Sequence, residues 1–397
     1  MTESSQPDTR TRLLLLIPHL GGGGAEQVTA LLARGLSPQK YELHLALITQ
    51  TVGVPEHASS TLPGWVTVHP LGAPRVRAAA LPLLRLLREL RPQLILSGMF
   101  HLNFLVLLLR PFLRFPVRIL IRQNGTASAA LAELPRYNRL LYRLLYRRAD
   151  RVVCQSAAMA RDLRDSFAVP ESRLAVLPNP IDSQAIRSTN SASADKWPDS
   201  GPHLLAVGRL SHEKGFDLLL ESLALVRELF PSADLLLAGS GAEESSLRAL
   251  CRKLSLDSAV CFLGRVAAPA AYFPHATLFV LSSRHEGLPN ALLEAASAGL
   301  PIVCAPASEG LVELIRQQPG VWLAPGPTAE ALADTLITAL TVVKPGQRFL
   351  HAFVEPFRLN AALAAWEQLI DRLLAGVPAA DLPAQPGRAP LRTPSRL

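Results

Sequence analysis

Short apolar runs alternate with amphipathic segments along almost the whole chain, and this alternation constrains the fold more than any other feature. Runs such as Thr11–Ile17, His203–Val207 and Leu278–Leu281 are typical of strands that are buried on both faces of a parallel sheet. The alternation occurs twice, on either side of a polar, Ser- and Asn-rich segment at 186–201. The sequence therefore predicts an α/β protein of two domains, each a parallel sheet covered by helices.

The predicted division of the 397 residues follows these changes in composition. It comprises a disordered N-terminus at 1–11, a first domain at 12–185, a linker at 186–201, a second domain at 202–359, a final helix at 360–375 and a disordered Pro- and Arg-rich tail at 376–397. For the final helix, packing back on the first domain is one arrangement that we consider.

Positive charge is concentrated in the first half of the chain. Residues 1–200 contain 24 Lys and Arg against 14 Asp and Glu, whereas residues 201–397 contain 16 against 18. A basic half favours an anionic partner surface. The segment at 135–151 is either a core helix with a solvated face or an interfacial helix whose arginines meet lipid phosphates. We expect no nucleic-acid partner, because no aromatic-and-basic module accompanies these arginines.

The cysteines and the N-terminus bear on location. Four scattered cysteines form no close pair and no cluster at zinc spacing, which favours a reducing compartment. The apolar segment at 102–121 is interrupted by arginines and prolines, so we do not expect it to span a bilayer. We see no signal peptide. We therefore expect a cytoplasmic protein, held peripherally at the inner face of the membrane through its basic first half.

The stretch at 278–300 contains a strand, a polar loop with Glu286, and a helix with Pro289 in its first turn and Glu294 one turn further on. A helix N-terminus attracts phosphate, and a carboxylate on each side is suited to holding the hydroxyls of a sugar and a ribose. The alternative is a helix whose acidic residues merely favour the helix dipole.

Other segments place polar groups where strands of a parallel sheet end. Arg209 and Lys214 follow the strand at 203–207, and two fixed cations there are suited to a diphosphate. A glycine loop at 21–24 follows the first strand, although a flexible turn is its simpler interpretation. His101 follows the strand at 94–96, at the edge where open α/β sheets bind ligands.

Five motifs together resemble the retaining glycosyltransferases of family four. They lie at 22–26, 208–220 (GRLSHEKGFDLLL), 239–241 (GSG), 262–266 (FLGRV) and 282–303 (SSRHEGLPNALLEAASAGLPIV). The resemblance covers about residues 11–375 and is strongest over 203–315. It implies the GT-B fold, in which two Rossmann-like domains face each other, the first binding the acceptor and the second the nucleotide sugar.

The resemblance also implies roles for individual residues. Arg209 and Lys214 would bind the donor diphosphate, Glu294 the ribose and Glu286 the sugar, while His101 and Asn103 would line the acceptor side. With Arg209, Lys214 and Glu286, His101 completes the expected catalytic set. The other residues expected at the donor are Gly22, Gly23, Val266, Gly287, Leu288, Pro289 and Asn290. This chain departs from the family pattern at Gly98, where many relatives carry histidine, and at Leu102, where a small residue is usual.

The expected function is a metal-independent, retaining transfer of a sugar from a nucleotide diphosphate donor. The donor would be a UDP-hexose or UDP-N-acetylhexosamine. The acceptor would be a polysaccharide or a polyprenyl-diphosphate-linked glycan of the bacterial cell surface, as in lipopolysaccharide or exopolysaccharide biosynthesis. Two alternatives stay open, a UDP-sugar epimerase of the same fold and a non-catalytic nucleotide-sugar-binding protein.

Overall fold

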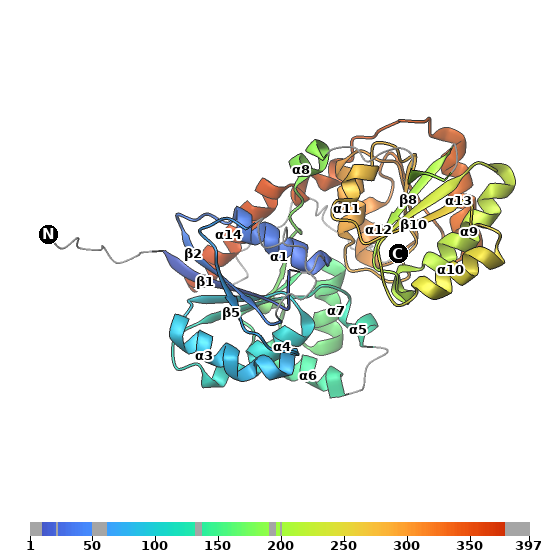
Figure 1. Ribbon diagram of the computed structural model, residues 1–397. Coiled ribbons are helices and arrows are strands. Elements are labelled where there is room, and N and C mark those ends of the chain that lie inside the picture. Colours follow the sequence, from blue (N-terminus) through green and yellow to red (C-terminus); the bar gives the residue numbers. More distant parts are fainter. Residues whose placement is uncertain are drawn as a thin grey trace, which may run out of the picture.

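The computed structural model describes residues 10–20, 23–49, 62–131, 137–189, 196–198 and 201–377, and these form two sheets with flanking helices (Figure 1). The first sheet has the strand order β3-β2-β1-β4-β5-β6-β7 and the second has the order β10-β9-β8-β11-β12-β13. Neighbouring strands are parallel in both sheets. The predicted α/β architecture of two Rossmann-like domains is confirmed.

The first sheet is built from short strands, which are largely buried except at its edge strands β3 and β7. Its elements are β1 (Thr11–Ile17), α1 (Gly24–Gly35), β2 (Tyr41–Leu47), β3 (Thr67–Pro70), α3 (Ala80–Leu90), β4 (Leu94–Ser97), α4 (Phe100–Leu109), β5 (Arg118–Arg122), α5 (Ala127–Ala130), α6 (Tyr137–Leu145), β6 (Arg151–Cys154), α7 (Ala157–Phe167) and β7 (Leu174–Val176). Along β1, Leu14 and Leu16 enter the core on one face of the sheet, while Leu13 and Leu15 enter the core on the other. Burial on both faces explains the continuous apolar runs in the sequence.

The second sheet repeats this arrangement, with an apolar core on each face. Its elements are α8 (Ser183–Ser188), β8 (His203–Val207), α9 (Phe216–Leu229), β9 (Asp234–Ala238), α10 (Glu244–Lys253), β10 (Val260–Gly264), β11 (Leu278–Leu281), α11 (Asn290–Ser297), β12 (Ile302–Cys304), α12 (Glu309–Ile315), β13 (Val321–Leu323) and α13 (Ala329–Val342). A 3-10 segment, η8 (Ala352–Phe357), leads to the last helix, α14 (Leu359–Leu374).

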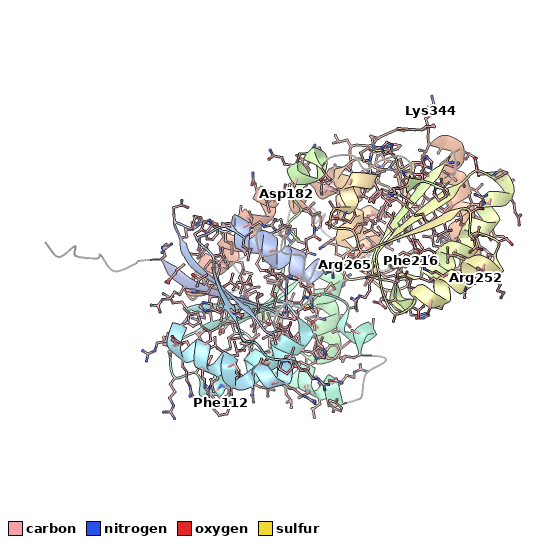
Figure 2. The ribbon with its side chains drawn as sticks, viewed as in Figure 1. Phe112, Asp182, Phe216, Arg252, Arg265 and Lys344 are labelled. Atoms are coloured by element: carbon pink, nitrogen blue, oxygen red, sulfur yellow. The ribbon has the colours of Figure 1, made fainter. Side chains whose placement is uncertain are left out.

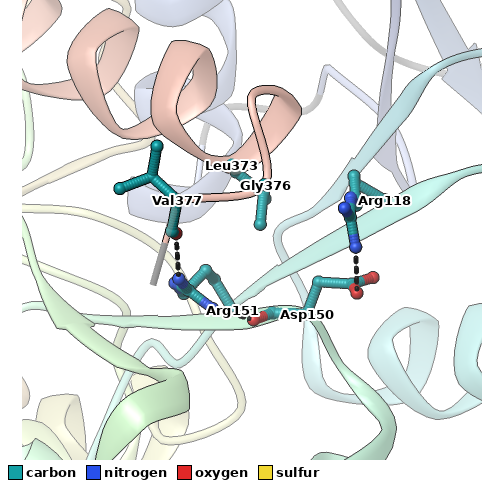
Figure 3. A pocket seen from close by; sticks show the side chains of 6 residues that line it. All are labelled: Arg118, Asp150, Arg151, Leu373, Gly376 and Val377. Atoms are coloured by element: carbon teal, nitrogen blue, oxygen red, sulfur yellow. Dashed lines mark hydrogen bonds and ion pairs between the residues drawn. The ribbon is translucent and has the colours of Figure 1, made fainter. Parts of the chain in front are cut away.

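Helix α14 packs on the first domain, beside α1 (Figure 1). Its Leu363, Trp366 and Leu369 join the core on one face of the first sheet. Trp366 is fully buried, and its indole N–H donates to the carbonyl of Pro178 at 3.1 Å. Just beyond the helix, Arg151 donates to the carbonyl of Val377 at 3.2 Å, beside a cavity of about 140 Å³ (Figure 3). The C-terminal helix is thus a structural part of the first domain.

The chain passes between the domains twice, near Ile181 and near residues 357–359, and these two segments lie side by side. The amide of Ile181 donates to the carbonyl of Phe357 at 2.8 Å, and the amide of Leu359 donates to the carbonyl of Ile181 at 2.9 Å. This crossing precedes the expected linker at 186–201. The described part of that segment belongs to the second domain, because α8 packs on α11 and Trp197 is buried against its core.

Candidate active site

Two neighbouring strands of the second sheet bring the predicted charged residues together. Lys214 lies in the loop after β8, and Glu286 lies in the loop after β11, the strand paired with β8. The ammonium of Lys214 is 2.5 Å from Oε1 of Glu286, and the hydroxyl of Ser283 donates to the same oxygen at 2.7 Å. Both ends of this ion pair are largely shielded from solvent, with side chains 22% and 10% exposed.

The two loops are fixed to each other by further contacts. The hydroxyl of Ser282 donates to the carbonyl of Lys214 at 2.9 Å. Arg284 makes a two-pronged ion pair with Asp217, with distances of 2.7 and 2.6 Å. Gly215 has φ of +61°, and a Cβ there would collide with the carbonyl of Ser282, so only glycine permits this close approach. Lys214 and Glu286 therefore occupy a preorganised position.

Glu294 lies one turn into α11, where a residue of the first domain contacts it. The side-chain amide of Gln27, in α1, donates to Oε1 of Glu294 at 2.9 Å. Burial raises the pKa of Glu294 to about 7, although the hydrogen bond from Gln27 acts in the opposite direction. The carboxylate is thus close to its protonation point at neutral pH.

Arg209 and Val266 border the same edge of the second sheet. Arg209 follows β8 and is exposed, whereas Val266 follows β10 and is half-buried. The Arg209 loop is supported from below, because the amide of Leu210 donates to the carbonyl of Ser240 at 3.0 Å in the Gly-Ser-Gly turn. Loops after β8, β10 and β11 therefore carry Arg209, Lys214, Val266 and Glu286, while Glu294 lies in α11.

The first domain contributes less to the site than the sequence indicates. Gly22 lies outside the described residues, and Gly23 is exposed as the N-cap of α1. His101 is exposed in the first turn of α4, where its ring centroid is 4.4 Å from that of Phe100 and partial desolvation lowers its pKa. Asn103 corrects our expectation, because it is fully buried and donates to the carbonyl of Arg122 at 2.8 Å. Because its side chain is enclosed, Asn103 cannot line an open surface as we expected.

The segment expected to face the donor is instead in contact with the first domain. Its four residues are Gly287, Leu288, Pro289 and Asn290. The amide of Leu288 donates to Oε1 of Gln155 at 3.0 Å. A Cβ on Gly287 would lie 2.7 Å from the carbonyl oxygen of Asn124. The amide of Leu288, one of the backbone groups that we assigned to the sugar and phosphate, therefore bonds to a side chain of the first domain.

Asn290 joins the two domains at their helix N-termini. Its side-chain amide donates to the carbonyl of Gly24 at 3.1 Å, and its oxygen accepts from the amide of Asn179 at 2.8 Å. Sequence reasoning missed the partners Gln27, Gln155 and Asn179. Single amide side chains carry no pattern that would have revealed them, because each acts only through the packing of distant segments.

No group of three or more His, Cys, Asp or Glu side chains within the described ranges is arranged to hold a metal ion. No helix among the described residues is long and apolar enough to cross a bilayer.

Two family models match successive parts of the chain. Residues 22–185 match the model of "Glycosyltransferase Family 4", and residues 189–349 match that of "Glycosyl transferases group 1". Together they cover both domains in the order seen in the structure.

Three known proteins illustrate the similarity. An uncharacterised glycosyltransferase of Methanocaldococcus jannaschii is 26% identical over 245 residues, which are 59% of this chain and 60% of that protein. A Campylobacter jejuni protein, named N-acetylgalactosamine-N,N'-diacetylbacillosaminyl-diphospho-undecaprenol 4-alpha-N-acetylgalactosaminyltransferase, is 28% identical over 316 residues, or 76% of this chain and 83% of that one. The crystal structure of Anabaena HepE in complex with UDP and glucose is similar in fold, with a TM-score of 0.72, 18% identity and coverage of 93% and 100%.

The two matched halves, the paired parallel sheets and the ordered motifs agree with one another. This chain belongs to the family-four glycosyltransferases of the GT-B fold.

Proposed function

We propose that this protein transfers a sugar, with retention of anomeric configuration, from a UDP-hexose or UDP-N-acetylhexosamine to a lipid-linked or polysaccharide acceptor. The observation that carries the proposal is the pairing of Lys214 with Glu286 across the loops after β8 and β11, the first of which also carries Arg209. Two similar proteins support its parts. The HepE structure contains UDP and glucose, and the Campylobacter protein is named for a diphospho-undecaprenol acceptor.

Binding of the donor would exchange partners within the Lys214–Glu286 pair. A diphosphate carries more negative charge than one carboxylate, so Lys214 and the exposed Arg209 would turn to its oxygens. Glu286 would then be free to accept hydrogen bonds from the sugar hydroxyls. Glu294 would exchange the amide of Gln27 for the ribose hydroxyls. The ion pair therefore keeps two opposite charges partly buried until the substrate separates them.

The cations would act mainly in the transition state. As the bond between the sugar and the β-phosphate breaks, negative charge grows on the leaving UDP, and fixed cations stabilise it without a metal ion. In the proposed front-face reaction, the acceptor hydroxyl attacks from the side of the leaving group. Its proton passes to the departing phosphate oxygen, which balances the reaction without a carboxylate nucleophile.

A donor screen tests the proposed activity. Radiolabelled UDP-glucose, UDP-galactose, UDP-N-acetylglucosamine and UDP-N-acetylgalactosamine would be incubated with bacterial membrane extract in the presence of EDTA. We expect label from one donor to enter a lipid-extractable or polymeric product with the anomeric configuration of the donor. An inverted product, or a requirement for divalent metal, would contradict the mechanism. Conversion of the UDP-sugar without an acceptor would favour an epimerase.

We also propose that the outer face of the first domain rests on an anionic membrane. This outer face is formed by α3, α6 and the 3-10 segment η2 (Arg110–Phe112). Figure 2 shows Phe112 on it, at the edge remote from the second domain. Large apolar side chains on this face and on the adjoining end of α4 are 50–66% exposed: Leu81, Leu108, Phe112, Tyr137, Leu140 and Leu144.

Helix α6 combines both interpretations of the segment at 135–151. Tyr142 and Leu145 are buried in the core of the first domain, as a core helix requires. Leu140 and Leu144 are exposed on another side of the helix, next to the exposed Arg139 and Arg143. Arginines beside exposed leucines fit a position at the boundary of lipid headgroups and acyl chains.

A shallow cavity on the same domain has the charge that a lipid headgroup requires. It measures about 370 Å³ and is lined by Arg88, Arg91, Arg114 and Phe115. The three guanidinium groups can donate to phosphate oxygens, while neighbouring apolar residues such as Phe112 enter the lipid. An anionic bilayer therefore matches both the charge and the apolar surface of the outer face.

Vesicle binding tests this second proposal. Sedimentation with vesicles of phosphatidylglycerol and phosphatidylethanolamine should retain the unmodified protein and release the double variant Leu140→Glu/Leu144→Glu. The control is Leu229→Glu on α9, where the leucine is 65% exposed on the second domain. Equal binding of both variants would contradict the proposed membrane face.

A further inference from the structure

Arg122, at the carboxyl end of β5, is a charged side chain enclosed in the first domain. It is only 1% exposed, and within the described residues no carboxylate forms an ion pair with it. Burial lowers the pKa of Arg122 to about 10, so the guanidinium stays protonated at neutral pH. Its Nη1 has no hydrogen-bond partner among the described residues. A buried cation without a counter-charge is costly, and in a folded protein it calls for a specific reason.

Among the described residues, the side chain of Arg122 makes a hydrogen bond that leads into the connection between the domains. Its Nη2 donates to Oδ1 of Asn179 at 2.8 Å. Asn179 is 2% exposed and lies next to Ile181, where the chain crosses into the second domain. Gly98 leaves space beside the guanidinium, since a Cβ there would lie 3.8 Å from Nη1.

The chemistry of arginine sets the direction of the hydrogen bonds that follow. A guanidinium has donors only, so Asn179 must present its oxygen to Arg122 and its amide to Asn290. Asn290 then accepts through Oδ1 at 2.8 Å, which leaves its own amide to donate to the carbonyl of Gly24 at 3.1 Å. If either asparagine were reversed, two groups of the same kind would face each other at one of these contacts.

The chain of contacts from Arg122 through Asn179 and Asn290 to Gly24 is here called the amide relay. It ends where α1 and α11 begin, and α11 follows the loop that carries Glu286. The relay therefore fixes the position of α11 relative to α1. Arg122, the first residue of the relay, is held in place from the interior, because Asn103 donates to the carbonyl of Arg122 and to the hydroxyl of Tyr146.

We propose that Arg122 is a positioning residue for the transfer reaction, which sets the direction of the amide relay and so holds the donor-binding end of α11 against the first domain. The inference rests on the proposed function. It assigns a role in that function to a residue of the first domain that acts through other side chains, whereas Lys214 and Glu286 belong to the second domain. The buried positive charge also favours an anionic group at the domain contact.

Asn179→Asp is the sharpest test of the relay. A carboxylate still accepts from Arg122 and supplies the missing counter-charge, so the variant should fold at least as well as the unmodified protein. It cannot donate to Asn290, so the relay is broken at its second step. We expect UDP binding, measured by calorimetry, to weaken about tenfold, which corresponds to the loss of one hydrogen bond of about 1.4 kcal/mol.

Variants at Arg122 distinguish the loss of its hydrogen-bond donors from the loss of its side-chain packing. Arg122→Lys keeps a donor-only cation and should retain most UDP affinity, whereas Arg122→Met, with neither donor nor charge, should weaken it about tenfold or more. Combining Arg122→Met with Asn290→Ala should give no further loss, since both break one chain of contacts. Additive losses would contradict a relay. Arg118→Met, at the exposed end of the same strand, is the matched control.

Amide hydrogen exchange, measured without nucleotide, tests the amide relay independently of the ligand that the protein binds. In Asn179→Asp, exchange should accelerate at the first turns of α1 and α11, and it should stay unchanged in α9. Unaltered exchange together with unaltered UDP affinity would overturn the relay while leaving the proposed function intact. If the unmodified protein fails to bind UDP, the proposed function fails, and the exchange result still decides whether the relay holds the two helices together.

Discussion

The two domains have the same architecture but hold their charged groups in different ways. The second domain presents Lys214, Glu286 and Arg209 on adjacent loops at one edge of its sheet. The first domain keeps Arg122 enclosed beneath that contact and exposes many other arginines on its outer face. Under the proposed function, the second domain would act on the donor directly. The first would position the second and hold the acceptor side at a membrane.

The first domain depends on the end of the chain, and this dependence gives the largest expected effect on stability. Trp366→Ala removes a fully buried side chain from α14 and should lower the free energy of unfolding by about 3–5 kcal/mol. Urea unfolding followed by circular dichroism would measure it. Trp322→Ala in the second domain is the control and should cost less, because Trp322 is only half-buried. Equal losses would remove this difference between the domains.

Removing a cation from the second domain should have the largest effect on catalysis. We expect Arg209→Ala and Lys214→Ala each to lower kcat by about 100-fold or more, because each cation would stabilise charge on the leaving UDP. Arg252→Ala, an exposed arginine of α10 on the same domain (Figure 2), should leave kcat unchanged. Near-normal turnover of the double variant at 209 and 214 would show that the second domain does not act in this way.

A smaller effect is expected where the domains touch. Gly287→Ala would place a Cβ 2.7 Å from the carbonyl of Asn124 and 2.9 Å from Oε1 of Gln155. Overpacking of this kind costs about 2 kcal/mol, so the arrangement in which Gly287 packs on Asn124 and Gln155 should become roughly 30-fold less populated. Because we propose that contact between the domains positions α11 for transfer, kcat/KM should fall in proportion. In Gly326→Ala, the added Cβ meets no atom within 4 Å, and activity should be normal. Normal activity in both variants would mean that the packing of Gly287 against the first domain is not needed for activity.

The smallest expected effect is the pH dependence of donor binding through Glu294. Its pKa of about 7 in the folded protein means that the carboxylate needed to accept from ribose is mostly lost at pH 6. UDP affinity should fall about tenfold from pH 8 to pH 6, and Glu294→Gln should abolish this dependence. A pH-independent affinity in the unmodified protein would show that Glu294 does not meet the ribose as an anion.

The same shift has a defined sign for stability. The folded-state pKa of Glu294 lies above the ordinary value of 4.5, so the folded protein binds the proton more tightly than the unfolded chain. The contribution of Glu294 to the free energy of unfolding should therefore be greatest below pH 4.5 and should decline as the pH rises to about 7. Comparing urea midpoints of the unmodified protein and Glu294→Gln over this range isolates the contribution.

Local sequence patterns predicted the features of the fold that depend on residues close together in the chain. The apolar runs gave the strands of both sheets, and the spacing of Glu286 and Glu294 gave a loop followed by a helix, because both signals reflect short-range geometry. Pro289 is the N-cap and not a residue of the first turn, a shift of one position. The segment that we expected as a linker, 186–201, includes the end of α8 and the buried Trp197 among its described residues, which its polar composition did not indicate.

The sequence did not predict the contacts between the domains. The roles of Gln155 on Leu288 and of Gln27 on Glu294 depend on how two complete sheets meet, which no periodicity records. Asn103 was expected to line the acceptor side, and its burial follows from the direction of one side chain in the first turn of α4. Arg122 was unremarked because an arginine at the end of a strand is ordinarily solvated.

The most direct test of the account is a crystal structure of the protein with a bound UDP-sugar. The account predicts that the Lys214–Glu286 ion pair opens, with Lys214 and Arg209 on the diphosphate, Glu286 on the sugar and Glu294 on the ribose. A nucleotide bound elsewhere, with the ion pair still closed at 2.5 Å, would contradict it.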